Sequence, residues 1–265
     1  MPLQKNQVLT LRVERLSSDG SGVAHSPDGE TVFIPGAAPG DEARVRIVKD
    51  CKRYAFGILD EVLTPSPDRI PVDCAVAGPC GACSLRHLDY AAELRAKQEN
   101  VADAFARIGG LDVPVLPIVG SPEVNRYRNK VQFPIAPARE GGIAVGYYRS
   151  RSHQVFPVED CLLQPEGVTR LRRAFVRAAE ELELTAYDEG TGTGLLRHLY
   201  VRTNHRGEAL CCIVANGTEL PGADRVVEAL RACEPRLVGV VLNVNTRDTN
   251  VILGSEYKLL WGQAY

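Results

Sequence analysis

The stretch "CAVAGPCGAC" at residues 74–83 places three cysteines within one short segment. Five residues separate Cys74 from Cys80, and two separate Cys80 from Cys83. A disulfide framework, a zinc site and an iron–sulfur ligand set would each impose a different structure on this segment. Two points distinguish these three alternatives: whether the protein lies in a reducing compartment, and whether the sequence offers a fourth ligand.

The N-terminal sequence indicates a reducing compartment. Residues 1–16 lack the basic start and apolar core of a secretory signal. The longest apolar runs, such as "ALCCIVA" at 209–215, are too short to span a bilayer. We therefore expect a cytoplasmic protein with no membrane partner, whose thiols stay reduced. This makes the disulfide framework the weakest of the three alternatives.

A fourth candidate ligand is Cys161, in the segment "PVEDCLLQP". Iron–sulfur clusters take four thiolates, often three from one loop and one from a distant segment, whereas structural zinc more often takes two closely spaced pairs. Gly78 and Gly81 would let the loop wrap tightly round a cluster. The spacing favours a [4Fe–4S] cluster, with zinc or no metal as the alternatives. The remaining cysteines fit core or incidental positions: Cys51, Cys211, Cys212 and Cys233.

Residues 7–63 have the pattern of five short strands separated by glycine-containing turns. Such a run favours a small closed β-barrel of the OB type, a fold that often binds oligonucleotides. The next segment, "TPSPDRIPVDC", carries three prolines and reads as a stiff linker. We therefore expect a barrel domain over residues 1–66 and a second domain over residues 67–265.

The second domain has an α+β pattern with mostly antiparallel connections. Amphipathic or capped segments predict three helices, at 88–108, 167–184 and 219–233. Strand-like runs occupy most of the rest: 126–137, 143–150, 153–158, 197–204, 209–217, 237–245 and 250–254.

A net charge of −2 gives no global signal for nucleic acid, so such a site needs local clustering. Residues 126–153 provide it, with basic side chains interleaved with aromatic ones. Basic groups hold phosphates and aromatic rings stack unpaired bases. Strand alternation would place the first three basic residues on one face, with a merely solvated face as the alternative. The predicted RNA contacts are Arg126, Arg128, Lys130, Arg149 and Arg151.

The cysteine spacing, with its distant fourth member, resembles the iron–sulfur signature of the RNA (uracil-5-)-methyltransferases. The segment "GSGVAHSPDGETVFIPGAAPGDEARVRI" resembles the TRAM domain of the ribosomal RNA enzymes. Four more segments resemble parts of that family's central domain, in the same order: "RYRNKVQFPI", "VGYYRSRSHQVFPVEDCLLQ", "GLLRHLYVRT" and "NVILGSEYKLLWGQAY". The resemblance implies a TRAM barrel that binds RNA, followed by an RNA-binding central domain. It also implies a [4Fe–4S] cluster held by Cys74, Cys80, Cys83 and Cys161.

Members of this family use S-adenosyl-L-methionine (SAM) to methylate C5 of uridine in 23S ribosomal RNA or tRNA. C5 becomes nucleophilic only after a cysteine thiolate adds to C6, and a base then removes the C5 proton. The resemblance places these groups and the SAM site in a C-terminal domain. The chain reaches Tyr265 without a strand–glycine-loop–helix unit.

We therefore expect the N-terminal portion of a 23S rRNA (uracil-5-)-methyltransferase that takes part in rRNA processing. It would carry no catalytic residue before Tyr265, be inactive alone, and require SAM only as a full-length protein. Helix 88–108 would expose an apolar face normally covered by the missing domain, which would allow self-association. The alternatives are a tRNA (uracil-5-)-methyltransferase, a stand-alone RNA-binding module with a structural metal, and an iron–sulfur electron-transfer protein.

Overall fold

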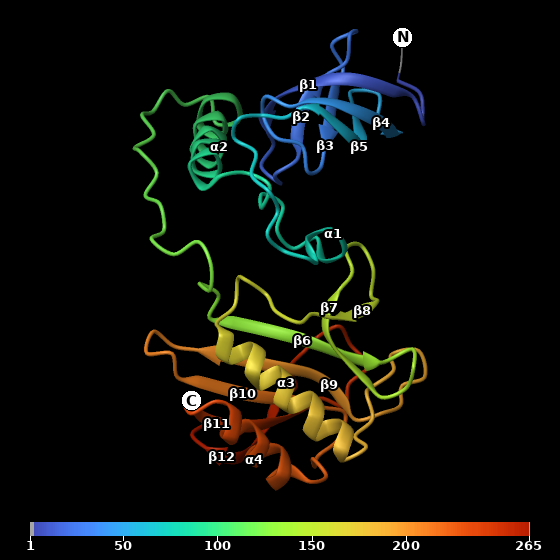
Figure 1. The fold of residues 1–265 in the computed structure, drawn as a ribbon, viewed down its shortest axis with the longest axis vertical. Helices are drawn as coiled ribbons and strands as arrows, with labels where there is room; N and C mark the ends of the chain where they lie inside the picture. Colours follow the sequence, from blue (N-terminus) through green and yellow to red (C-terminus); the bar gives the residue numbers. More distant parts are fainter. Residues whose placement is uncertain (1–2, 265) are drawn as a thin grey trace. The chain divides into compact units, whose positions relative to one another are not determined.

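The computed structural model describes residues 3–264 and divides the chain into two compact units, Met1–Pro122 and Glu123–Tyr265 (Figure 1). The predicted domain boundary at residues 66 and 67 therefore lies inside the first unit. No helix in the described part of the chain is long and apolar enough to cross a membrane.

The first unit begins with a closed β-barrel whose strands follow the order β1-β2-β3-β5-β4. Alternate residues of the strands point inward, and side chains such as Val32, Val45 and Ile47 are fully buried. The predicted five-stranded barrel is therefore confirmed. Its strands are β1 (Val8–Leu16), β2 (Gly22–His25), β3 (Thr31–Ile34), β4 (Glu42–Asp50) and β5 (Tyr54–Thr64).

A buried ion pair joins the barrel to the segment that follows it. Asp41 has no exposed surface and accepts hydrogen bonds from the guanidinium of Arg69 at 2.8–3.2 Å. Its carboxylate also accepts the backbone N–H groups of Ala38 at 2.7 Å and Ser66 at 2.9 Å. Burial alone would raise the pKa of Asp41, but these hydrogen bonds outweigh it and lower the pKa. The proline-containing linker is therefore fixed on the barrel.

Three helical segments complete the first unit: α1 (Ala77–Cys80), α2 (Tyr90–Asp103) and the π-helical turn η1 (Ala104–Ile108). Asp89 is the N-cap of α2, and its carboxylate accepts the N–H of Ala92 at 2.6 Å. The helix buries Ala92 and Ala96, and Ala96 belongs to an apolar cluster with Leu16. Two larger apolar side chains of the predicted helix are exposed, Val101 of α2 by 47% and Ile108 of η1 by 88%.

The second unit is a seven-stranded sheet in the order β12-β11-β10-β9-β6-β7-β8. Two helices, α3 (Glu166–Glu181) and α4 (Ala223–Cys233), cover one face of it (Figure 1). All strand pairs are antiparallel except β10 and β11, which α4 connects in parallel. The strands are β6 (Lys130–Pro137), β7 (Ile143–Tyr148), β8 (Val155–Pro157), β9 (Leu196–Thr203), β10 (Ala209–Ala215), β11 (Leu237–Val244) and β12 (Glu256–Gly262).

The mixed α+β fold is confirmed, but two predicted strand segments are wrong. Residues 250–254 form a loop, because the amide of Asn245 donates to the carbonyls of Val251 and Ile252 at 2.7 and 3.0 Å. The last strand is β12 instead. Residues 126–129 also lie outside the sheet, since β6 begins only at Lys130.

Candidate functional site

The three clustered cysteines lie around the short helix α1. Cys74 precedes the helix, Cys80 ends it, and Cys83 follows it. Gly81 closes the helix in the left-handed conformation, with φ of 63°, and donates its N–H to Ala77 at 3.1 Å. This is a backbone conformation that favours glycine. All three thiols are half-buried and free of disulfides.

Cysteine thiolates are suitable ligands for a metal or an iron–sulfur cluster, but the positions of these thiols do not form a ligand set. Within residues 3–264, no three His, Cys, Asp or Glu side chains are grouped closely enough to hold a metal ion. Cys161 belongs to the second unit and is also half-buried and unpaired. The [4Fe–4S] cluster therefore stays a prediction from the sequence.

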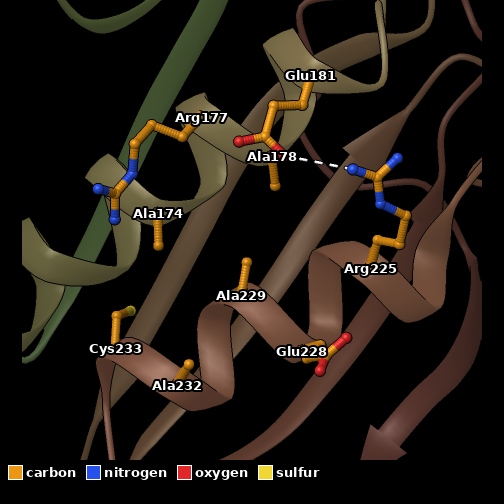
Figure 2. A pocket seen from close by; sticks show the side chains of 9 residues that line it. All are labelled: Ala174, Arg177, Ala178, Glu181, Arg225, Glu228, Ala229, Ala232 and Cys233. Carbon is orange, nitrogen blue, oxygen red and sulfur yellow. Dashed lines mark hydrogen bonds and ion pairs between the residues drawn. The ribbon is translucent and has the colours of Figure 1, made fainter.

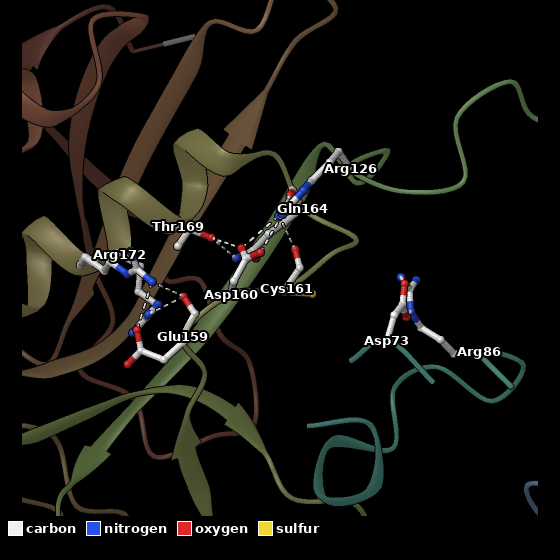
Figure 3. Close-up of polar contacts among 10 residues, drawn as sticks. Asp73, Arg86, Arg126, Glu159, Asp160, Cys161, Gln164, Thr169 and Arg172 are labelled. Carbon is white, nitrogen blue, oxygen red and sulfur yellow. Dashed lines mark hydrogen bonds and ion pairs between the residues drawn. The ribbon is translucent and has the colours of Figure 1, made fainter. Parts of the chain in front are cut away.

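An ion pair lies at the two ends of the cysteine loop. Arg86 donates Nε and Nη2 to the carboxylate of Asp73 at 2.6 and 2.8 Å (Figure 3). The hydrogen bond from Arg86 lowers the pKa of Asp73, and the same hydrogen bond raises the pKa of Arg86. The loop between residues 73 and 86 is thus held closed by a two-point contact.

The loop that carries Cys161 is fastened by Arg126. This guanidinium forms a two-point ion pair with Asp160, at 3.0 and 2.6 Å, and donates to the carbonyls of Cys161 and Gln164 at 2.8 and 3.0 Å (Figure 3). Thr169 donates its hydroxyl to Asp160 at 2.9 Å. The hydrogen bond from Arg126 is the main reason that the pKa of Asp160 falls to about 2.

Arg126 therefore has an internal role that its position in a basic segment did not reveal. Its backbone is left-handed, with φ of 59°, and its side chain is 30% exposed. The prediction that strand alternation places Arg126, Arg128 and Lys130 on one face is wrong, because residues 126–129 do not form a strand. Backbone hydrogen bonds to Leu162 and Leu163 hold this segment instead.

The other four predicted RNA contacts are exposed and have no carboxylate partner in residues 3–264. Arg128 precedes β6, Lys130 begins it, and Arg149 and Arg151 lie in the turn between β7 and β8. In the described part of the chain, none of the four has a carboxylate within 4.0 Å. The guanidinium of Arg149 lies 5.4 Å from the ring centre of Phe156. These cations are therefore free to meet phosphates.

Sheet pairing adds a cation that the sequence analysis missed. Lys130 of β6 lies opposite Arg202 of β9, and Gln132 lies opposite Tyr200. The hydroxyl of Tyr200 accepts the Nε–H of Arg202 at 2.9 Å. These side chains alternate with the buried residues that face α3 and α4, so they belong to the opposite face of the sheet. The alternation of polar and apolar residues in "RHLYVRT" would have predicted that Tyr200 and Arg202 share the face opposite the core.

The barrel carries an aromatic cluster that was also missed. Phe33 on β3 and Tyr54 and Phe56 on β5 lie with ring centres 5.6–5.8 Å apart. Tyr54 is 40% exposed, so the cluster reaches the surface. Exposed rings on a barrel can stack unpaired bases. By contrast, Arg44 and Arg46 are paired with Glu61 and Asp60.

A pocket of about 500 Å³ lies between α3 and α4, on the outer side of the helical layer (Figure 2). Its floor consists of alanines, and one of its arginines, Arg225, is paired with Glu181 at 3.3 Å. Cys233 borders it, and burial raises the pKa of this thiol. Burial also raises the pKa of Cys211, and that of Cys212 to about 12. These three thiols stay protonated near neutral pH and are poor nucleophiles.

Known proteins are similar in sequence to the barrel alone and also to the whole chain. Residues 2–59 match the TRAM domain. The chain is 40% identical to an uncharacterized RNA methyltransferase of Halalkalibacterium halodurans, a match that covers 100% of the chain and 58% of the relative. It is 36% identical to another of Gloeobacter violaceus, over 99% of the chain and 58% of that relative.

A solved structure shares the fold. The chain resembles Pyrococcus abyssi tRNA (uracil-54, C5)-methyltransferase in complex with S-adenosyl-L-homocysteine, with a TM-score of 0.67 and 22% identity. The likeness covers 96% of this chain and 56% of that one, and at this identity it concerns the fold alone. The chain therefore contains a TRAM domain and is similar along its whole length to proteins named RNA methyltransferases, of whose length it spans just over half.

Proposed function

We propose that this chain is the RNA-binding part of a SAM-dependent RNA (uracil-5-)-methyltransferase that acts on 23S ribosomal RNA. The observation that carries the proposal is its similarity, over the whole chain, to relatives named RNA methyltransferases. The TRAM domain and the uncompensated cations Arg128, Lys130, Arg149 and Arg151 support a role in RNA binding.

Uracil specificity rests on the sequence resemblance and is tested by product analysis. The protein encoded by this sequence and the coding sequence that continues it would be incubated with SAM and with unmodified 23S rRNA or tRNA. We expect 5-methyluridine in the digested 23S rRNA. Its appearance in tRNA alone would transfer the proposal to the tRNA alternative. A methylated nucleoside other than 5-methyluridine would contradict uracil specificity.

The competing function is a stand-alone RNA-binding module with a structural metal. The two differ in what the coding sequence specifies after Tyr265. A glycine-rich SAM loop and a later cysteine would favour the methyltransferase, because the reaction needs a methyl donor and a thiolate nucleophile. An immediate stop codon would favour the module.

We also propose a structural [4Fe–4S] cluster bound by Cys74, Cys80, Cys83 and Cys161. The support is chemical: these four thiols are half-buried and form no disulfide, whereas Cys211 and Cys212 are buried in a strand. Anaerobically purified protein should be brown and contain about four irons per chain. Cys161→Ser should lower the iron content, and Cys233→Ser should not. One zinc per chain without iron would contradict the cluster.

A further inference from the structure

A second pocket of the second unit lies where β6 ends and β9 begins. It has a volume of about 190 Å³, below the range of about 300–1,000 Å³ that is typical for drug-sized ligands. It therefore suits a single ring system. The polar and aromatic side chains among its lining are Tyr148, His153, Tyr187, Asp188, Glu189, Arg197 and His198.

Aromatic rings provide flat surfaces in this pocket. Tyr148 and His153 have ring centres 5.7 Å apart and are both exposed to solvent. Tyr187 is buried, and the guanidinium of Arg197 lies 4.3 Å from its ring centre. The exposed pair can meet a ligand from solvent, while the buried pair fixes the arginine in place.

Arg197 has hydrogen-bonding capacity that the protein does not use. It is only 7% exposed, yet no carboxylate within residues 3–264 lies within 4.0 Å of it. Its Nη1 donates to the carbonyls of Asn245 and Arg247 at 3.0 and 2.7 Å, and its Nε and Nη2 have no hydrogen-bond partner in the described chain. Neither nitrogen is among the fully buried side-chain atoms that lack a partner, so both remain accessible at the pocket and can donate to a ligand with acceptor atoms.

His198 keeps the pocket from carrying a second positive charge. Burial, together with the charge of Arg197, lowers the pKa of His198 to about 4, so the imidazole is neutral near pH 7. Its Nδ1 has no hydrogen-bond partner in the described chain. Asp188 and Glu189 also line the pocket and would repel a phosphate. A neutral flat ring with carbonyl oxygens meets all of these conditions better than an anion does.

We propose that this pocket binds one unpaired base of the RNA, stacked on Tyr148 and His153, with Arg197 donating to a carbonyl oxygen of the base. The proposal rests on the proposed function for its choice of RNA as the ligand. It adds a site for the base itself, separate from the cations that would hold the phosphates. RNA-binding proteins commonly recognise unpaired bases by this combination of stacking and hydrogen bonding.

The test compares two probes that carry the same charge. One is a labelled oligouridine of about ten nucleotides, within the range that single-strand binding folds cover, and the other is the same backbone with abasic residues. The 265-residue chain should bind oligouridine more tightly. Tyr148→Ala should weaken oligouridine binding by at least about fivefold, the low end for base–aromatic stacking, and leave abasic binding unchanged.

Two further variants separate stacking from misfolding. Tyr148→Phe keeps the ring and should bind oligouridine as the parent does, and His153→Ala alters an exposed residue and should weaken binding as Tyr148→Ala does. Tyr257→Ala is the control, because Tyr257 is 54% exposed on β12 and does not line the pocket.

The outcomes distinguish the pocket from the wider function. Equal binding of both probes, or unchanged oligouridine binding by both Tyr148→Ala and His153→Ala, would overturn the base pocket while leaving RNA binding intact. Failure of the parent chain to bind either probe would overturn RNA binding and the base pocket together.

Discussion

Arg126 and Asp160 form a two-point ion pair, Nη1 to Oδ1 at 3.0 Å and Nη2 to Oδ2 at 2.6 Å, which fastens the segment entering β6 to the loop of Cys161. The same arginine donates to the carbonyl of Cys161. A residue of the basic segment thus positions a predicted cluster ligand, and this contact can be tested without any metal or RNA.

Asp160→Asn should destabilise the second unit by about 1.5–2 kcal/mol, the low end for hydrogen bonds to charged groups, because the pair is partly solvated. Trp261, the single tryptophan, lies on β12 of that unit, so its fluorescence reports urea unfolding there. Glu159→Gln is the matched control, since Glu159 is 89% exposed in its pair with Arg173. Equal midpoints for both variants would contradict a structural role for Asp160.

The same carboxylate predicts a pH dependence. The pKa of Asp160 falls from 3.8 to about 2 in the folded protein, so the folded state favours the charged form. Its contribution to stability is complete above about pH 4 and is lost as the pH falls from 3.8 towards 2. The stability difference between the parent and Asp160→Asn should therefore shrink between about pH 4 and pH 2. A difference that stays constant over this range would show that the charge of Asp160 is not involved.

Arg69→Ala should destabilise the barrel by about 3 kcal/mol, because it leaves the fully buried Asp41 without its charged partner. Hydrogen exchange of the barrel amides measures this loss directly. Arg95→Ala removes an arginine that is 55% exposed in its pair with Asp68 and should have little effect. Similar exchange rates in the two variants would mean that the pair of Asp41 and Arg69 does not hold the linker on the barrel.

The exposed apolar side chains of the first unit predict self-association. Ile108, Leu116 and Val119 are 88%, 80% and 93% exposed. Exposed large apolar side chains that come together in a patch commonly mark an interaction site. Sedimentation should detect oligomers of the isolated chain, and Ile108→Lys should reduce them. Val251→Lys, at a residue 63% exposed in the second unit, should not change them. A monomer at all protein concentrations would contradict the expectation.

The parts of the fold that the sequence predicted well depend on local patterns. Alternation and glycine turns specify the barrel strands, and amphipathic periodicity specifies α3 and α4. The strand predicted at residues 126–129 fails because a distant segment, residues 161–164, holds Arg126 in a left-handed conformation. Local alternation carries no information about such a contact.

In the candidate site, too, the sequence predicts features of one short segment but not contacts between distant segments. The spacing of Cys74, Cys80 and Cys83 is a feature of one short segment, and the sequence displays it directly. The pairing of Lys130 with Arg202 arises from the register between β6 and β9, which only the folded sheet reveals. The pocket at Arg197 likewise combines four segments of the second unit.

The central claim is that the cations around β6 to β8 bind RNA, and a salt titration tests it most directly. Arg128→Ala and Arg149→Ala would be compared with the parent for binding a structured ribosomal RNA loop, by fluorescence anisotropy at several salt concentrations. Arg236→Ala, at an arginine beside Glu234, is the control. Each lost phosphate contact should weaken binding by about 1 kcal/mol and lower the log–log salt slope by about 0.7. Unchanged affinity and slope in both variants would contradict RNA binding by this surface.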